Sequence, residues 1–164
     1  FWAAVLLQVA LGAFVAGLDA GTIHTSWPGF NGQLIPEEYL SGMPFWQAIF
    51  ESRPAVQLQH RWFAYVLVIA AGALAWAYHS SGDKVMRNFA LILPGVIGVQ
   101  VVLGIATLMA AAPLSLSLLH QGGAIALFLT AGAAAWTAAR ALPVQDSSDM
   151  IARPMTSRAT NFTR

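Results

Sequence analysis

The chain contains no cysteine, and only 9% of its 164 residues are charged. The absence of thiols excludes disulfides, thiolate zinc sites and iron–sulfur clusters, so histidine is the only strong side-chain ligand for a transition metal. A soluble domain carries about a quarter charged residues, and the scarcity of charge excludes an ordinary soluble globule and a disordered chain. The net charge of +1 offers no basic face to a phosphate backbone, so nucleic acid is not an expected partner.

Apolar residues make up 57% of the chain and gather in long stretches. A lipid bilayer core about 30 Å thick needs roughly 20 apolar residues of helix. Residues 1–142 are therefore predicted to form an all-α membrane unit, a four-helix transmembrane bundle that runs up, down, up and down. The charge-free stretches, with a break at Pro113 because proline stops a helix, place these helices at about 1–18, 59–79, 88–112 and 114–141.

The first stretch is apolar from its first residue, without a Met or a positively charged leader, which predicts a piece of a longer protein. Lys and Arg are enriched in cytoplasmic loops, and six of the eight basic residues lie on one side if the 19–58 loop is outside. We therefore expect a multi-pass protein of a bacterial inner membrane, with the 19–58 loop in the periplasm. The polar tail 143–164 is expected to be disordered and cytoplasmic.

Within the outer loop, the aromatic residues after Pro36 predict a short helix lying in the membrane interface. It would act either as an anchor or as a lid. Within the spans, Gln8, Gln100 and Thr107 are expected to form hydrogen bonds between helices.

The predicted topology separates the four histidines. His60 lies at the outer start of the second helix, and His120 lies about two turns inside the outer start of the fourth. His79 follows His60 by 19 residues, about 28 Å along a helix, so it cannot share a centre with His60. His24 lies in the outer loop.

The second and fourth helices of such a bundle are commonly diagonal, so two inward imidazoles at one depth can hold a planar metal macrocycle between them. This pattern predicts a bis-histidine haem site with His60 and His120 as the iron ligands. Arg61 would meet the haem carboxylates at the outer rim. The alternative for His120 is a hydrogen bond to a carbonyl or hydroxyl group of a neighbouring helix, and the alternative for His60 is a polar helix end that reaches the membrane interface.

Five segments resemble the haem A synthase family in order and spacing: 12–21, 27–28, 59–61, 100–108 and 119–121. The resemblance covers about residues 1–142 and implies the second, C-terminal half of an eight-helix membrane oxidoreductase. It implies that the whole enzyme converts haem O to haem A by oxidising a ring methyl to a formyl group. In this half, His60 and His120 would be the axial ligands of a haem b used for electron transfer.

The partners implied are the missing N-terminal four-helix half, haem O and haem A, the lipid bilayer, and an electron acceptor such as quinone. The catalytic residues are unknown from this chain, and this half alone is expected to be inactive. Two other interpretations remain: a free-standing b-type cytochrome that exchanges electrons with quinone, and a non-haem transporter or assembly subunit. A second four-helix unit would exclude the cytochrome, and bound haem would exclude the transporter.

Overall fold

The computed structural model describes residues 1–40 and 42–141, so the tail predicted to be disordered, 143–164, lies outside the described residues. The described part is helical, with one isolated β-bridge between Phe30 and Gln33, which confirms the all-α class. Its elements are α1 (Trp2–Gly17), the 3-10 turn η1 (Ala20–Thr22), α2 (Phe45–Glu51), α3 (Arg53–Tyr78), α4 (Lys84–Met109) and α5 (Leu114–Ala141).

Three of these helices, α3, α4 and α5, are long and apolar enough to cross a membrane by length and composition. The helix α1 is also apolar but has 16 residues, and roughly 20 are needed to cross the hydrocarbon core. The structure therefore supports the last three of the four predicted spans, and the span predicted at 1–18 remains a prediction.

Two helices start earlier than their sequence patterns predict. The helix α3 begins at Arg53, because Pro54 suits the first turn of a helix, where no backbone N–H donor is needed. The outer loop is consequently shorter than the predicted 19–58. The helix α4 begins at Lys84, because the Asp83 carboxylate accepts hydrogen bonds from two backbone N–H groups of its first turn, at 2.8 and 3.2 Å.

The predicted break near Pro113 is confirmed, although α4 ends three residues before the predicted position. It ends at Met109 because the turn that follows has left-handed backbone, with φ of 59° at Ala111 and 55° at Ala112. The helix α5 then begins at Leu114, directly after the proline.

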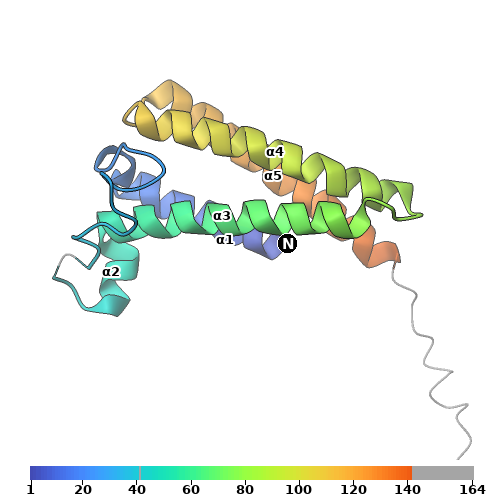
Figure 1. The fold of residues 1–164 in the computed structure, drawn as a ribbon, viewed down its shortest axis with the longest axis horizontal. Helices are drawn as coiled ribbons and strands as arrows, with labels where there is room; N and C mark the ends of the chain where they lie inside the picture. The colour runs from blue at the N-terminus through green and yellow to red at the C-terminus, as the bar shows by residue number, and fades with distance from the viewer. Residues whose placement is uncertain (41, 142–164) are drawn as a thin grey trace, which may run out of the picture.

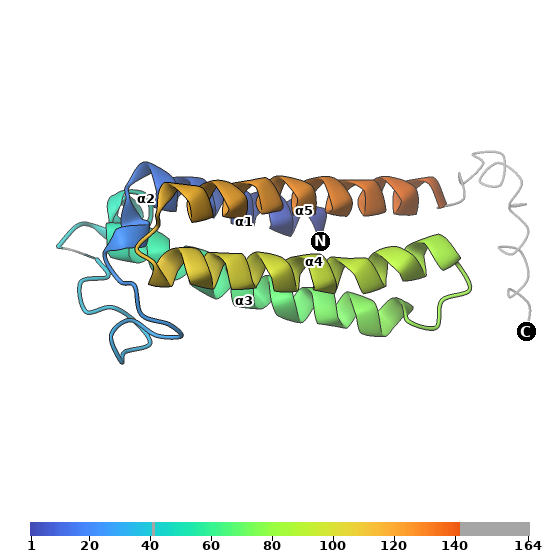
Figure 2. The same cartoon turned by 90° about the horizontal axis from the view of Figure 1, so that it is seen from above.

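The helices α1, α3, α4 and α5 form a bundle in which each packs against two others (Figure 1). The helix α4 packs against α3 and α5, and α1 packs against the same two helices. The helices α3 and α5 are therefore diagonal across the bundle. The turn between α4 and α5 lies at the same end as α2 and the long loop, whereas the turn between α3 and α4 lies at the opposite end (Figure 2).

The interior of the bundle is small and apolar, and all four bundle helices contribute to it: Val5, Leu67, Ala71, Leu93, Ile97, Leu127 and Ala131. The outside is also apolar, with large side chains such as Ile69 and Trp76 exposed. Apolar groups on both faces of a helix are what a lipid environment permits, because hydrocarbon surrounds the outer face.

The segment between α1 and α3 covers one end of the bundle (Figure 1). A short helix, as predicted after Pro36, is present as α2, but it is limited to seven residues that begin after Pro44. Phe45 and Trp46 on this helix are 64% and 70% exposed, and the placement of α2 in a membrane interface stays a prediction. Phe50 contacts Phe14 of α1, with ring centroids 5.6 Å apart, and thereby attaches α2 to the bundle.

Candidate functional site

Two histidines meet between the diagonal helices at the end of the bundle covered by the loop. The imidazole rings of His60 on α3 and His120 on α5 have centroids 6.4 Å apart and perpendicular planes. His79 follows the last residue of α3 at the opposite end, where its Nδ1 lies 2.5 Å from the carbonyl oxygen of Trp76. His24 lies in the loop, 3.8 Å from the carboxylate of Glu38. The structure thus brings together the pair predicted from topology and keeps the other two histidines apart from it.

Each histidine of the pair faces a glycine on an adjacent helix. A Cβ atom built on Gly12 of α1 would lie 3.0 Å from Cε1 of His60. A Cβ atom built on Gly104 of α4 would lie 2.9 Å from Cε1 of His120. Real Cβ atoms rarely approach a neighbour this closely, so the absence of a side chain at both glycines makes room for the imidazoles.

Each histidine is also bonded to a glutamine on that same adjacent helix. Nε2 of Gln8 donates to the carbonyl oxygen of His60 at 3.1 Å and lies 3.1 Å from Nδ1 of its ring. Nε2 of Gln100 donates to the carbonyl oxygen of His120 at 2.6 Å. Thr107 likewise joins two helices, donating to the carbonyl oxygens of Leu103 and Leu116. The predicted hydrogen bonds between helices are confirmed for all three polar residues.

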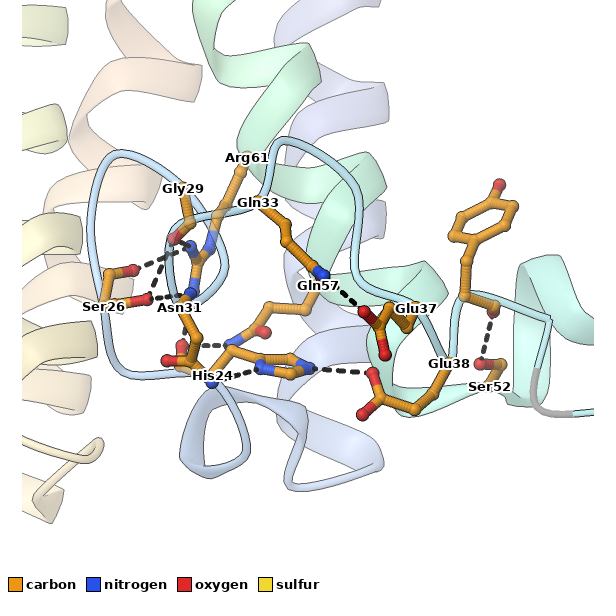
Figure 3. Close-up of polar contacts among 11 residues, drawn as sticks. His24, Ser26, Gly29, Asn31, Gln33, Glu37, Glu38, Ser52, Gln57 and Arg61 are labelled. Carbon is orange, nitrogen blue, oxygen red and sulfur yellow. Dashed lines mark hydrogen bonds and ion pairs between the residues drawn. The ribbon is translucent and has the colours of Figure 1, made fainter.

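Arg61, the residue after His60, is buried and binds the loop (Figure 3). Its Nη1 donates to the carbonyl oxygens of Ser26 at 2.9 Å and Gly29 at 3.1 Å. Its Nη2 donates to the carbonyl oxygen of His24, and its guanidinium lies 4.2 Å from the ring centroid of Phe30. Both terminal nitrogens therefore hold the loop, while Nε has no hydrogen-bond partner among the described residues.

Other residues of the first turns of α3 hold the same loop. Nε2 of Gln57 donates to the carbonyl oxygen of His24 at 3.1 Å, on the same helix face as Arg61 one turn later (Figure 3). Arg53 donates to the carbonyl oxygen of Asp19 at 2.5 Å and to Oγ1 of Thr22 at 3.0 Å. The loop is consequently fixed to the helix that carries His60 at several points.

The histidine pair fits a metal bound between two imidazoles. Nitrogen ligands bind such metals at about 2 Å, so imidazoles on opposite sides of one metal have centroids about 6 Å apart. The observed separation is 6.4 Å, and Nδ1 of His120 is buried without a hydrogen-bond partner in the described part of the chain. Within residues 1–40 and 42–141, no three or more His, Cys, Asp or Glu side chains gather as a metal site. The described residues thus present two imidazole rings to a metal at this point of the bundle.

The sequence interpretation missed two features of the site. These are the glycines that face the two imidazoles and the pairing of each glutamine with a histidine. A signal for them exists, because the pattern Gln-Val-x-Leu-Gly occurs twice, at 8–12 and at 100–104. In each copy the glutamine and the glycine are four residues apart, so both lie on one face of a helix.

A family model described as "Cytochrome oxidase assembly protein" matches residues 1–132. Relatives named "Heme A synthase" include one from Maricaulis maris (strain MCS10), 54% identical over 138 residues, which covers 84% of this chain and 40% of the relative. The relative from Caulobacter sp. (strain K31) is 45% identical over 142 residues, covering 85% of this chain and 41% of the relative. The relative from Brucella ovis is 37% identical over 138 residues, covering 84% and 38%.

The chain thus spans about 40% of the length of these relatives. No solved structure matches it. The resemblance to the haem A synthase family is confirmed, and the chain belongs to the cytochrome oxidase assembly protein family.

Proposed function

We propose that this chain is the C-terminal, haem-binding half of haem A synthase, the membrane oxidoreductase that converts haem O to haem A by oxidising a ring methyl to a formyl group. The observation that carries the proposal is the pairing of His60 and His120 across the bundle, with ring centroids 6.4 Å apart. The names of the relatives support the reaction, and the 40% share of their length is consistent with a missing N-terminal half.

His60 and His120 would hold haem b by its iron. A haem with two imidazole ligands supplies an electron-transfer couple without an open iron position. The chain's own residues place the two imidazoles, hold the loop against the same end of the bundle, and offer Nε of Arg61 as a remaining donor toward a haem carboxylate. An electron acceptor such as quinone would complete the reaction, and the catalytic residues would lie outside this chain.

The proposal also includes a membrane orientation. In an up-down-up-down arrangement across a bacterial inner membrane, the histidine pair and its loop would face the periplasm. Lys84 begins α4 and Arg140 lies in the last turn of α5, both at the bundle end away from the loop. Basic residues are enriched on the cytoplasmic side, so this placement favours a cytoplasmic C-terminus.

A visible spectrum of the full-length gene product, oxidised and then reduced with dithionite, tests the proposal, with pyridine haemochrome used to type the haem. We expect a low-spin b-type spectrum. The part of this spectrum that comes from haem bound to this chain should be lost in His60→Ala and also in His120→Ala. His79→Ala serves as the matched control, because His79 lies at the other end of α3, and should leave the spectrum unchanged. A folded protein without haem, or one that keeps this part of the spectrum in both variants, would contradict the proposal.

Synthesis of haem A is the second readout. Full-length protein supplied with haem O and a quinone as electron acceptor should form haem A, detected by the formyl-dependent shift of the pyridine haemochrome. A protein that binds haem b through the histidine pair but never forms haem A would be a b-type cytochrome instead.

A further inference from the structure

We propose that Gln8 with Gly12, and Gln100 with Gly104, are two equivalent positioning devices, each of which sets the depth and orientation of one histidine of the pair. This inference rests on the proposed function, because it concerns how the two imidazoles are presented to a haem. None of the four residues is a haem ligand in this proposal.

The two devices share two contacts, in different parts of the bundle, and Gln8 additionally lies 3.1 Å from Nδ1 of the His60 ring. In each, a glutamine side chain donates to the backbone carbonyl of the histidine on the adjacent helix, at 3.1 Å for His60 and 2.6 Å for His120. One helical turn later, a glycine faces Cε1 of the same imidazole. The first device joins α1 to α3, and the second joins α4 to α5.

The two contacts control different degrees of freedom. The hydrogen bond to the carbonyl fixes the histidine's helix against sliding and rotation relative to its neighbour. The glycine lets the imidazole lie directly against the backbone of that neighbour, with the ring edge at Cε1 facing the glycine. A residue with a side chain there would displace or rotate the ring, because the Cβ would lie only 3.0 or 2.9 Å from Cε1.

Not every glycine of α1 and α4 lies against a neighbouring helix. A Cβ built on Gly17 of α1 or on Gly98 of α4 meets no atom within 4 Å. On these two helices the close contacts to an imidazole occur at the glycines that lie four residues after a glutamine. On α1 and α4, the glycines that contact an imidazole are therefore the ones that end the repeated pattern Gln-Val-x-Leu-Gly.

The test uses the full-length gene product, with the His60→Ala, His120→Ala double variant defining the signal of this chain. In Gly12→Ala and Gly104→Ala we expect a changed g anisotropy of the low-spin ferric haem in electron paramagnetic resonance, since it reports the angle between the imidazole planes. We also expect haem affinity to fall about tenfold or more, as it does when groups supporting a metal ligand are lost, measured by haem transfer to apomyoglobin. Gln8→Leu and Gln100→Leu remove the hydrogen bond without adding an atom against the rings. They should also change the g anisotropy and lower the haem affinity.

The matched controls are Gly17→Ala and Gly98→Ala, on the same two helices but in open space, which should keep both the spectrum and the affinity. Helical circular dichroism is recorded for all variants. If the wild-type protein carries haem that depends on both histidines, but the four variants match the controls, this inference fails and the proposed function stands. If all four variants lose their helices, the residues are structural only and the inference also fails. If the wild-type protein carries no such haem, the proposed function itself fails.

Discussion

Replacing Arg61 with leucine should release the loop segment 24–30 from the end of the bundle. The change removes three hydrogen bonds from the guanidinium to carbonyl oxygens of this segment and its contact with the ring of Phe30. Arg61 is only 8% exposed, so solvent does not replace these bonds cheaply. A hydrogen bond to a charged group contributes about 1.5–3 kcal/mol, and three bonds that share one group are not additive.

We therefore take about 3–4 kcal/mol as the loss of loop attachment, which is roughly a 150- to 1,000-fold increase in the opening equilibrium. Hydrogen–deuterium exchange followed by mass spectrometry, on full-length protein in detergent, measures this directly. Amide protons of residues 24–33 should exchange faster by about that factor, including the N–H of Phe30, which donates to Gln33 at 2.7 Å. Exchange in α4 and α5 should be unchanged.

Arg53→Leu is the matched control, because Arg53 also donates to the loop from the first turn of α3 but is solvent-exposed. Exposed charged contacts contribute about 0–1 kcal/mol, so exchange near residues 19–22 should rise less than about tenfold. Equal small effects of the two substitutions, or unchanged exchange in 24–33 for Arg61→Leu, would show that the buried guanidinium does not hold the loop.

Other consequences follow from the packing, the helix cap and the histidine pair. Leu93 of α4 is 3% exposed, so Leu93→Ala should open a cavity between helices and lower the free energy of unfolding in detergent by about 2–3 kcal/mol. Leu91 of the same helix is 57% exposed, so Leu91→Ala should change this free energy by less than about 0.5 kcal/mol. Asp83→Ala should cost about 1 kcal/mol, since two backbone N–H groups lose their acceptor, and exchange at the start of α4 should report it; no change there would refute the cap. In His120→Gly, added imidazole should restore the low-spin spectrum, and failure of rescue in a folded variant would count against this residue as an axial ligand.

Much of the site was predictable because it depends on helical spacing. The 19 residues between His60 and His79 already exclude a shared centre, and the position of each apolar stretch places His60 and His120 at the same end of the bundle. The contacts of Arg61 were not predictable in the same way. Its partners are backbone carbonyls of a loop more than 30 residues earlier, and backbone carbonyls have no sequence signature.

The helix boundaries were also predictable only in part. The apolar stretches predict that α3 and α4 exist, but not that α3 extends back to Arg53 or that Asp83 starts α4, because polar residues continue a helix whenever caps and first-turn residues permit it. The break between α4 and α5 was predictable from Pro113, since a proline cannot continue a helix. The left-handed residues before it, Ala111 and Ala112, were not, since alanine carries no preference for that conformation.

By itself, the sequence determined the helical class, the apolar stretches and the two candidate ligands, because these follow from composition and from the regular rise of a helix. It indicated the family separately, through five segments that resemble haem A synthase in order and spacing. Only the tertiary structure decided that the two imidazoles lie 6.4 Å apart across diagonal helices. It also decided that Gly12 and Gly104 make room for them and that Arg61 binds the loop. These facts depend on which faces of different helices meet and at what depth. Such contacts arise from packing between segments far apart in the chain, which local spacing does not specify.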